Sequence, residues 1–183
     1  SLEAGGAVTP APTDAALLVA VEDYFAVDDV PGAVDNAADW YRWLRKGRGL
    51  AAANIVILRD HQATREVIEA GAARAAKQVG AGGTLWFVFV GHGAPSVDGK
   101  DALLLGVDVQ PNVNSIQTRG VGRDAILTTL SKGKQARVVA VMDACFSGRT
   151  PSNQPLIAGL QPLVPVVNTR LTHRVILLTA AAH

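Results

Sequence analysis

The sequence predicts an α/β protein whose mostly parallel sheet carries helices on both faces. Short apolar runs rich in β-branched residues alternate along the chain with longer segments in which apolar residues recur at helical spacing. Such runs fit strands that are buried on both faces, as the strands of parallel sheets are. Because strands and helices alternate, each strand is expected to reach its neighbour through a crossover helix.

The first half of the chain is expected to contain a lead-in followed by alternating strands and helices. Residues 1–14 are rich in Gly, Ala, Pro and Thr, which indicates a flexible lead-in. The elements expected after it are a strand over Ala15–Val21, an acidic loop over Glu22–Val30, a helix from Pro31 to Lys46, a strand over Asn54–Leu58, a helix over Thr64–Val79 and a strand over Thr84–Val90.

The second half continues this alternation and adds two irregular parts. A β-hairpin is expected at the rim of the sheet, and a long proline-containing segment is expected to be a loop of functional importance or a cleaved one. The expected elements are a hairpin over Asp98–Val109, a helix over Gly122–Leu130, a strand over Val138–Met142, a loop over Arg149–Leu171 and a strand over Val175–Thr179.

Composition excludes several classes of protein. A chain of 183 residues with 49% apolar residues suits one domain with a core, and its net charge of +1 indicates neither nucleic-acid nor membrane-surface binding. With one cysteine, no internal disulfide can form. The sequence lacks an apolar run of about 18 residues, so we expect no membrane span, in a protein that is either cytoplasmic or exported. Because it also lacks the spacing of metal ligands, we expect neither a metal nor another cofactor.

Two stretches place reactive side chains directly after buried strands. Cys145 follows the apolar run Val138–Met142, and His92 follows the run Thr84–Val90. The carboxyl ends of neighbouring parallel strands meet at one edge of a sheet, where α/β proteins bind ligands. Histidine is the usual group that activates a cysteine thiol, so the pair is a candidate catalytic dyad. Considered without His92, Cys145 fits a small buried apolar residue better, because most cysteines are of that kind.

These stretches, FVFVGHG and VVAVMDACFSG, resemble the caspases, metacaspases and their bacterial relatives. The histidine lies roughly 50 residues before the cysteine, as in that family. The resemblance covers most of the chain and implies a caspase–hemoglobinase fold, in which residues 15–183 form the large-subunit part of a catalytic domain. It implies a cysteine endopeptidase with Cys145 as nucleophile, His92 as its base and the backbone amides of Gly93 and Cys145 as oxyanion donors.

The resemblance also suggests which substrates are cleaved. Asp143 should face the same side of its strand as Cys145, and the matching aspartate of metacaspase-like relatives binds Arg or Lys before the cut. Animal caspases carry an arginine near the position of Val30, and this chain does not. Asn36 and Asp35 stand where relatives place a second acid, so we expect both to bind substrate. Alternatively, Asp143 bonds to loop amides.

Two other classes of enzyme do not fit the residues around Cys145. A tyrosine-phosphatase-like enzyme would need arginine where the chain has Pro151, and an α/β-hydrolase would need glycine where it has Asp143. A caspase-like binding or scaffold module with little peptidase activity remains the alternative. This chain stops at His183, soon after the last expected strand, whereas relatives continue with a smaller portion that adds another strand and part of the substrate cleft. The resemblance therefore implies self-processing and a second fragment, the small subunit, as partner.

Overall fold

The computed structural model describes residues 9–144, 146 and 174–179 of the chain. Within these residues, the centre is a five-stranded sheet with the order β2-β1-β3-β7-β8, in which every neighbouring pair is parallel. The predicted fold class is therefore confirmed, and the arrangement is the one that the resemblance implied. The strands are β1 (Ala15–Ala20), β2 (Ile55–Arg59), β3 (Thr84–Val90), β7 (Arg137–Asp143) and β8 (Val175–Thr179).

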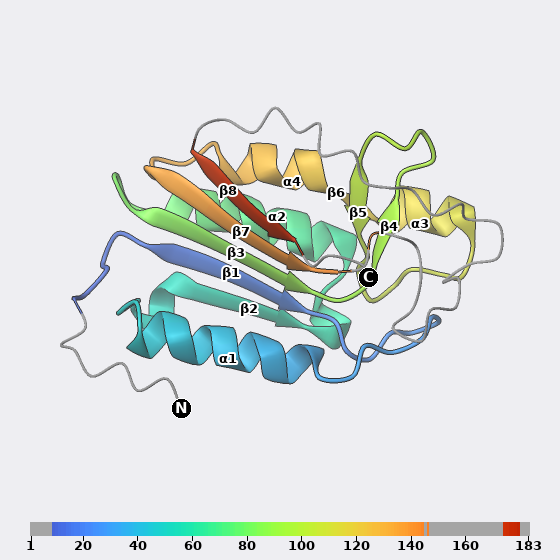
Figure 1. The fold of residues 1–183 in the computed structure, drawn as a ribbon, viewed down its shortest axis with the longest axis horizontal. Coiled ribbons are helices and arrows are strands. Elements are labelled where there is room, and N and C mark those ends of the chain that lie inside the picture. The colour runs from blue at the N-terminus through green and yellow to red at the C-terminus, as the bar shows by residue number, and fades with distance from the viewer. Residues whose placement is uncertain (1–8, 145, 147–173, 180–183) are drawn as a thin grey trace.

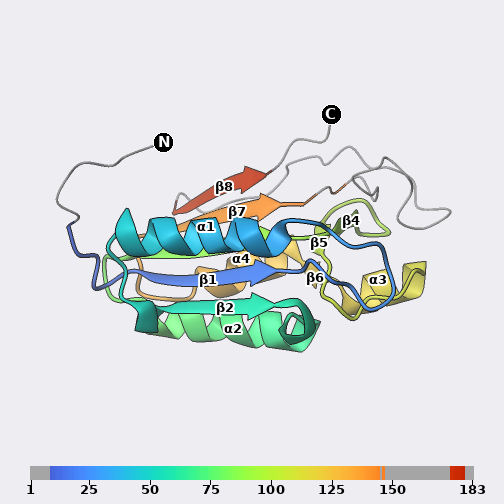
Figure 2. The ribbon, with the colours of Figure 1, turned by 90° about the horizontal axis from the view of Figure 1, so that it is seen from below.

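Helices lie on both faces of this sheet, as Figures 1 and 2 show. One helix, α1, packs against β1 and β3, whereas α2 covers β1 and β2 from the opposite face and α4 packs beside α2. Short 3-10 turns at Ala52–Asn54 and Asp60–Gln62 flank β2. The helices that we predicted are α1 (Ala33–Lys46), α2 (Arg65–Gln78) and α4 (Arg123–Leu130).

A small antiparallel sheet lies beyond the carboxyl ends of the parallel strands (Figure 1). It consists of β4 (Gly93–Pro95), β5 (Ala102–Leu104) and β6 (Val121–Gly122). The hairpin predicted over Asp98–Val109 is therefore shifted toward the N-terminus, and Asp98 lies in its turn. Residues 105–109 leave the ladder because their backbone bonds elsewhere: the N–H of Val107 donates to the carbonyl of Ala63 at 3.0 Å. A short helix that we did not predict, α3 (Val113–Arg119), connects β5 to β6.

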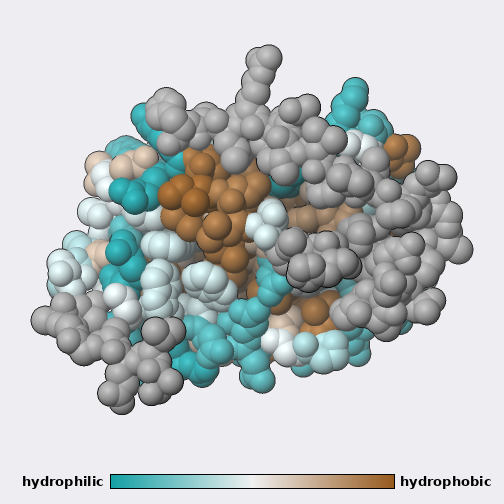
Figure 3. Space-filling view, viewed as in Figure 1, coloured by the Kyte–Doolittle hydropathy of each residue, from teal (hydrophilic) through white to brown (hydrophobic). Residues whose placement is uncertain are grey.

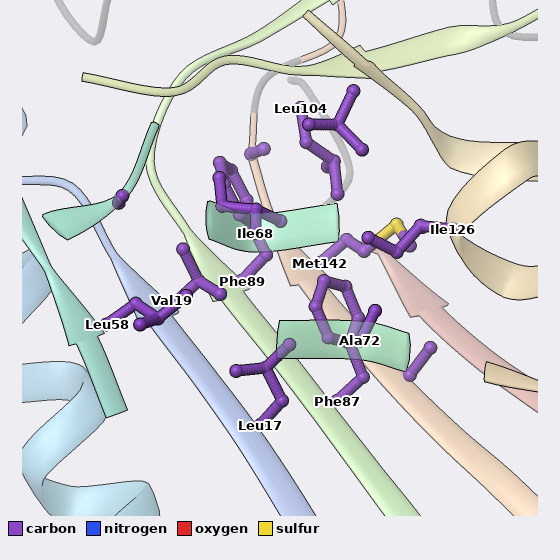
Figure 4. Close-up of a cluster of buried hydrophobic side chains, with 14 of the residues drawn as sticks. Leu17, Val19, Leu58, Ile68, Ala72, Phe87, Phe89, Leu104, Ile126 and Met142 are labelled. Atoms are coloured by element: carbon purple, nitrogen blue, oxygen red, sulfur yellow. The ribbon is translucent and has the colours of Figure 1, made fainter. Parts of the chain in front are cut away.

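The core occupies both faces of the central strands. On the α2 side, Leu17 and Val19 of β1 pack with Phe87 and Phe89 of β3 and with Met142 of β7 (Figure 4). The intervening residues of these strands pack on the α1 side, among them Ala16, Leu18 and Val88. Since successive side chains of a strand point to opposite faces, a strand covered on both sides must be apolar throughout. This explains the unbroken apolar runs of the sequence.

Asp14, the last residue of the predicted lead-in, ties the start of β1 to the start of β3. Its side chain is buried, and it accepts the backbone N–H of Thr84 at 2.8 Å and the indole N–H of Trp86 at 3.2 Å. A buried N–H without an acceptor costs about 1–3 kcal/mol, so this carboxylate fixes where the two strands begin relative to each other.

Exposed apolar side chains lie on α1 and on the part of the sheet beside it. Trp43 is 44% exposed, and Ile176 and Leu178 of β8 are 47% and 53% exposed. A groove of about 450 Å³ lies between α1 and these strands. Figure 3 shows the corresponding hydrophobic area over β7 and β8. We define the β7–β8 face as Trp40, Trp43, Trp86, Val139, Val141, Ile176 and Leu178.

Candidate active site

The ends of β3 and β7 meet at one edge of the sheet because the two strands are parallel neighbours, with Val90 opposite Asp143. The contact continues past the strands, since the N–H of Gly91 donates to the carbonyl of Asp143 at 3.2 Å. His92 is the second residue after β3, and Cys145 is the second residue after β7. The register therefore brings the two sequence motifs to the same level of the sheet.

Cys145 itself lies outside the described residues, but both residues that flank it are described. Ala144 and Phe146 are buried. A Cβ built on Gly93 would lie 3.3 Å from the Cβ of Ala144 and 2.6 Å from Cδ1 of Phe146. Because any side chain at position 93 would collide with Phe146, the glycine after the histidine is required by this close approach. The sequence neighbours of the cysteine and of the histidine are thus in contact.

The imidazole of His92 is buried and oriented by a backbone carbonyl. His92 is 3% exposed, and its Nε2 lies 2.7 Å from the carbonyl oxygen of Asp28. A carbonyl oxygen can only accept a hydrogen bond, so Nε2 must carry the hydrogen. In the neutral ring, Nδ1 is then the basic nitrogen and is the atom that can accept a proton.

Burial lowers the pKa of His92 below the ordinary value for histidine, because the charged form loses its hydration. The bond to the Asp28 carbonyl and the negative charges of Asp28 and Asp29 act in the opposite direction, but their influence is smaller. The lowered pKa favours a neutral ring near neutral pH. A neutral imidazole is what a base needs in order to take a proton from a thiol.

The Asp28 carbonyl is a part of the site that the sequence did not reveal. The residue that bonds the imidazole of His92 contributes a main-chain oxygen and not a side chain. Every residue has the same main-chain carbonyl whatever its side chain is, so no pattern of residue types could have marked this one. Only the path of the loop between β1 and α1 brings it to the ring.

The backbone amide of Gly93 is directed away from the neighbouring strand β5. Gly93 is opposite Leu104 in the antiparallel register, and the N–H of Leu105 donates to the carbonyl of His92 at 3.0 Å. This pattern is that of a non-hydrogen-bonded pair, in which the N–H groups of the paired residues point outward. The amide of Gly93 is therefore not used by β5.

A cavity of about 200 Å³ joins His92 to the residues expected to bind substrate. Asp143 and Asn36 both line it, and Oδ2 of Asp143 accepts a hydrogen bond from Nδ2 of Asn36 at 2.9 Å. Asp35 is exposed in the first turn of α1 and is not among the residues that line the cavity. The remaining lining residues are Val30, Pro31, Gly32, Ala33, Val90, Gly91 and Ala144. The structure thus brings Asp143, Asn36 and His92 together and leaves Asp35 outside.

The described part of the chain holds neither a cluster of metal-binding side chains nor a membrane-spanning helix. Among residues 9–144, 146 and 174–179, no three side chains of His, Cys, Asp or Glu lie close enough together to hold a metal ion. None of the helices within these ranges has the length and apolar character needed to cross a membrane.

Comparison with known proteins identifies the family and shows a similar fold. The family model described as metacaspase, peptidase C14 domain, matches residues 15–152. No curated protein matches the chain. A crystal structure of a protein from Geobacter sulfurreducens is similar, with a TM-score of 0.55 and 24% identity over 73% of this chain and 51% of the other. This chain spans about half the length of that structure, and the likeness concerns the fold.

We expect His92 to make the stability of the protein depend on pH. As the pH falls through about 6.5, the unfolded chain takes up a proton on this imidazole. The folded chain, in which the pKa of His92 is lowered, takes it up only at lower pH. The free energy of unfolding should therefore fall by up to about 1.4 kcal/mol per pH unit between these two pKa values. Chemical denaturation at a series of pH values measures this slope.

The control variants separate His92 from the other titrating groups. All proteins carry Cys145→Ala, so that the thiol does not titrate together with the ring. His92→Gln should flatten the slope, whereas His61→Gln, at an exposed position, should leave it unchanged. Equal slopes for the parent and the His92→Gln protein would contradict the assignment.

Proposed function

The chain belongs to the metacaspase family, and we propose that it is a cysteine endopeptidase that hydrolyses peptide bonds after Arg or Lys. The catalytic domain proposed here spans residues 15–183, as the large-subunit part, after a lead-in of residues 1–14. The strongest support is the buried ring of His92, which is held through Nε2 by the Asp28 carbonyl and keeps Nδ1 as its basic nitrogen. His92 and Ala144, the residue before Cys145, line the same cavity.

The proposed reaction begins with transfer of the thiol proton of Cys145 to Nδ1 of His92. The thiolate forms a bond to the carbonyl carbon of the substrate, and the carbonyl oxygen becomes an oxyanion that accepts hydrogen bonds from the amides of Gly93 and Cys145. His92 returns the proton to the leaving amine as the peptide bond breaks. Water then attacks the thioester carbon with His92 as base, which releases the carboxylic acid and restores the thiol.

Cys145→Ala should abolish peptide hydrolysis and leave the fold intact. Loss of a nucleophile removes the covalent route, so the rate should fall by several orders of magnitude, about 10³-fold or more. A chloromethyl ketone peptide ending in Arg provides a second measurement by mass spectrometry. It should alkylate Cys145 in the wild type and react far more slowly with His92→Ala.

The comparison variant for His92→Ala is His61→Ala, because His61 is exposed in the turn after β2. The chloromethyl ketone should alkylate Cys145 in the His61→Ala protein as fast as in the wild type. Near-wild-type turnover in Cys145→Ala would refute the nucleophile. A folded wild-type protein that neither labels nor hydrolyses peptides would favour the alternative, a caspase-like binding or scaffold module.

The preference for a basic residue is supported by the cavity beside His92. The cavity is lined by the carboxylate of Asp143, whose Oδ2 accepts a hydrogen bond from Asn36. The side-chain amide oxygen of Asn36 is a further acceptor in the lining. A guanidinium can form charge-assisted hydrogen bonds to such oxygens, each contributing about 1.5–3 kcal/mol. An aspartate side chain would meet repulsion from the same carboxylate. Peptides with Arg before the cut should be cleaved faster than peptides with Lys, because the planar guanidinium can form hydrogen bonds to two oxygens at once.

We expect Asp143→Ala to lower kcat/KM for Arg peptides by roughly tenfold to a hundredfold, the effect of losing one or two charge-assisted bonds. Fluorogenic peptides ending in Arg, Lys, His and Asp measure the preference. Asp35→Ala is the matched variant, since it removes the same charge from an exposed position that does not line the cavity. Its effect should stay below about threefold. Faster cleavage after Asp than after Arg, or an Arg preference that survives Asp143→Ala, would contradict the assignment.

We also propose that self-processing yields a second segment of the same protein, which covers the β7–β8 face. Support comes from the exposed apolar side chains Trp43, Ile176 and Leu178, because soluble proteins rarely leave such contiguous surfaces in water. The similar structure, of which this chain spans about half, leaves room for such a segment. The second segment would present an apolar helix stripe or strand to the groove beside α1.

The full gene product should therefore appear as two fragments that elute together in size-exclusion chromatography, each identified by intact mass. Cys145→Ala should yield one uncleaved chain. Leu178→Asp, in the β7–β8 face, should weaken the association of the fragments by at least roughly tenfold, since it would bury an unpaired charge. Val97→Asp, at a 71% exposed position in the β4–β5 turn, should not. A single species of residues 1–183 that is fully active alone would refute the second segment.

A further inference from the structure

The loop between β1 and α1 carries a tyrosine whose contacts surround His92. The phenol oxygen of Tyr24 accepts the backbone N–H of His92 at 2.8 Å and donates to the carbonyl of Leu105 at 3.0 Å. The two rings are in contact, with centroids 4.9 Å apart and planes inclined by 45°. These contacts lie within the core, because Tyr24 is 8% exposed and His92 is 3% exposed.

The same residue holds the segment that supplies the carbonyl to the imidazole. The backbone N–H of Tyr24 donates to Oδ1 of Asp29 at 3.1 Å. Asp29 directly follows Asp28, whose carbonyl oxygen accepts the Nε2 hydrogen of His92. Both ends of the hydrogen bond between His92 and Asp28 are therefore anchored on Tyr24, one through its phenol and the other through its amide.

We propose, on the basis of the function above, that Tyr24 is a positioning residue that holds the His92 ring against the Asp28 carbonyl. A ring fixed at Nε2 presents Nδ1 in one direction, and a base must lie within hydrogen-bond reach of its proton. Small misplacements of a catalytic group lower the rate strongly, by up to about a hundredfold for 1 Å. Tyr24 thus acts through His92 and is not among the residues that line the cavity.

Two features of the surroundings agree with this role. Burial raises the pKa of Tyr24, so the phenol keeps the hydrogen that it donates to Leu105. A Cβ built on Gly91 would lie 2.8 Å from the phenol oxygen, closer than real side chains approach. The glycine before the histidine is therefore needed for the approach of Tyr24, as the glycine after it is needed for Phe146.

The first test compares the two tyrosines of the chain. Tyr24→Phe keeps the ring and removes only the oxygen that holds the backbone of His92. We expect kcat to fall roughly tenfold to a hundredfold, with KM within about twofold, because substrate binding is untouched. Tyr41→Phe, at a half-buried position on α1, should keep the wild-type kcat. A loss confined to KM, or none, in folded Tyr24→Phe would overturn the proposal.

The second test uses Asp29, which is exposed and whose variants should fold. Asp29→Ala removes the acceptor of the Tyr24 amide and should lower kcat in the same way. Asp29→Asn keeps an oxygen acceptor without the charge and should restore most of the rate. Because both changes loosen one hydrogen bond, Tyr24→Phe combined with Asp29→Ala should be little worse than the more severe single change. Full additivity, or failure of Asp29→Asn to rescue, would contradict the shared anchor.

The third test does not depend on catalysis. Nuclear magnetic resonance of ¹⁵N-histidine-labelled protein should show a neutral His92 with its hydrogen on Nε2 and slow exchange of that hydrogen with water. Tyr24→Phe should speed the exchange at least about tenfold, and Tyr41→Phe should not change it. If the wild type hydrolyses no peptide, the proposed function fails, and the exchange rate still decides the role of Tyr24. Unchanged exchange in Tyr24→Phe would overturn the positioning role whatever the activity.

Discussion

The parallel pairing of β3 with β7 is the constraint on which the rest of the structure depends. It places Val90 opposite Asp143, so the residues that follow the two strands emerge at the same level of the sheet. A slip of one residue in this pairing would turn the side chains of one strand to the opposite face. Both faces of these strands are buried, and such a slip would remove either Phe87 of β3 or Met142 of β7 from the core. Packing of the core therefore fixes the geometry of the edge.

The loop between β1 and α1 completes this edge from the other side. Because β1 is the parallel neighbour of β3, its carboxyl end lies beside that of the histidine strand. The loop contributes the Asp28 carbonyl to the imidazole and Val30 to the wall of the cavity. A carbonyl orients the ring without placing a full negative charge on Nε2–H, and the ring stays neutral because burial lowers the pKa of His92.

In the function proposed above, the carboxylate of Asp143 would have two opposing effects at this edge. A negative charge near a thiol disfavours the thiolate, whereas the same charge attracts a cationic side chain into the cavity. The hydrogen bond from Asn36 spreads the charge of Asp143 and fixes the direction of its oxygens. An amide at position 36 supports the carboxylate and adds no second charge. The result is a small polar cavity beside a dry, apolar core, with a histidine at the boundary between them.

The sequence by itself determined the fold class, the family and the edge at which the two motifs lie. The buried runs of β3 and β7 need apolar residues at every position, and this requirement is visible in any single chain. The bounds predicted for β8 from the sequence, Val175–Thr179, are the observed ones. His92 was found because a reactive side chain stands out directly after such a run, whereas Asn36 and the substrate-binding role of Asp143 came from the resemblance to metacaspases.

Only the tertiary structure decided which groups meet. It selected Asn36 over its neighbour Asp35, because successive residues of a helix point in different directions and one of them faces Asp143. It shifted the rim hairpin, because the backbone of residues 105–109 bonds to other segments such as Ala63. It revealed the Asp28 carbonyl and the phenol of Tyr24 at His92, since contacts between a loop and a strand end distant in sequence depend on the path of the chain and leave no pattern in the residue types.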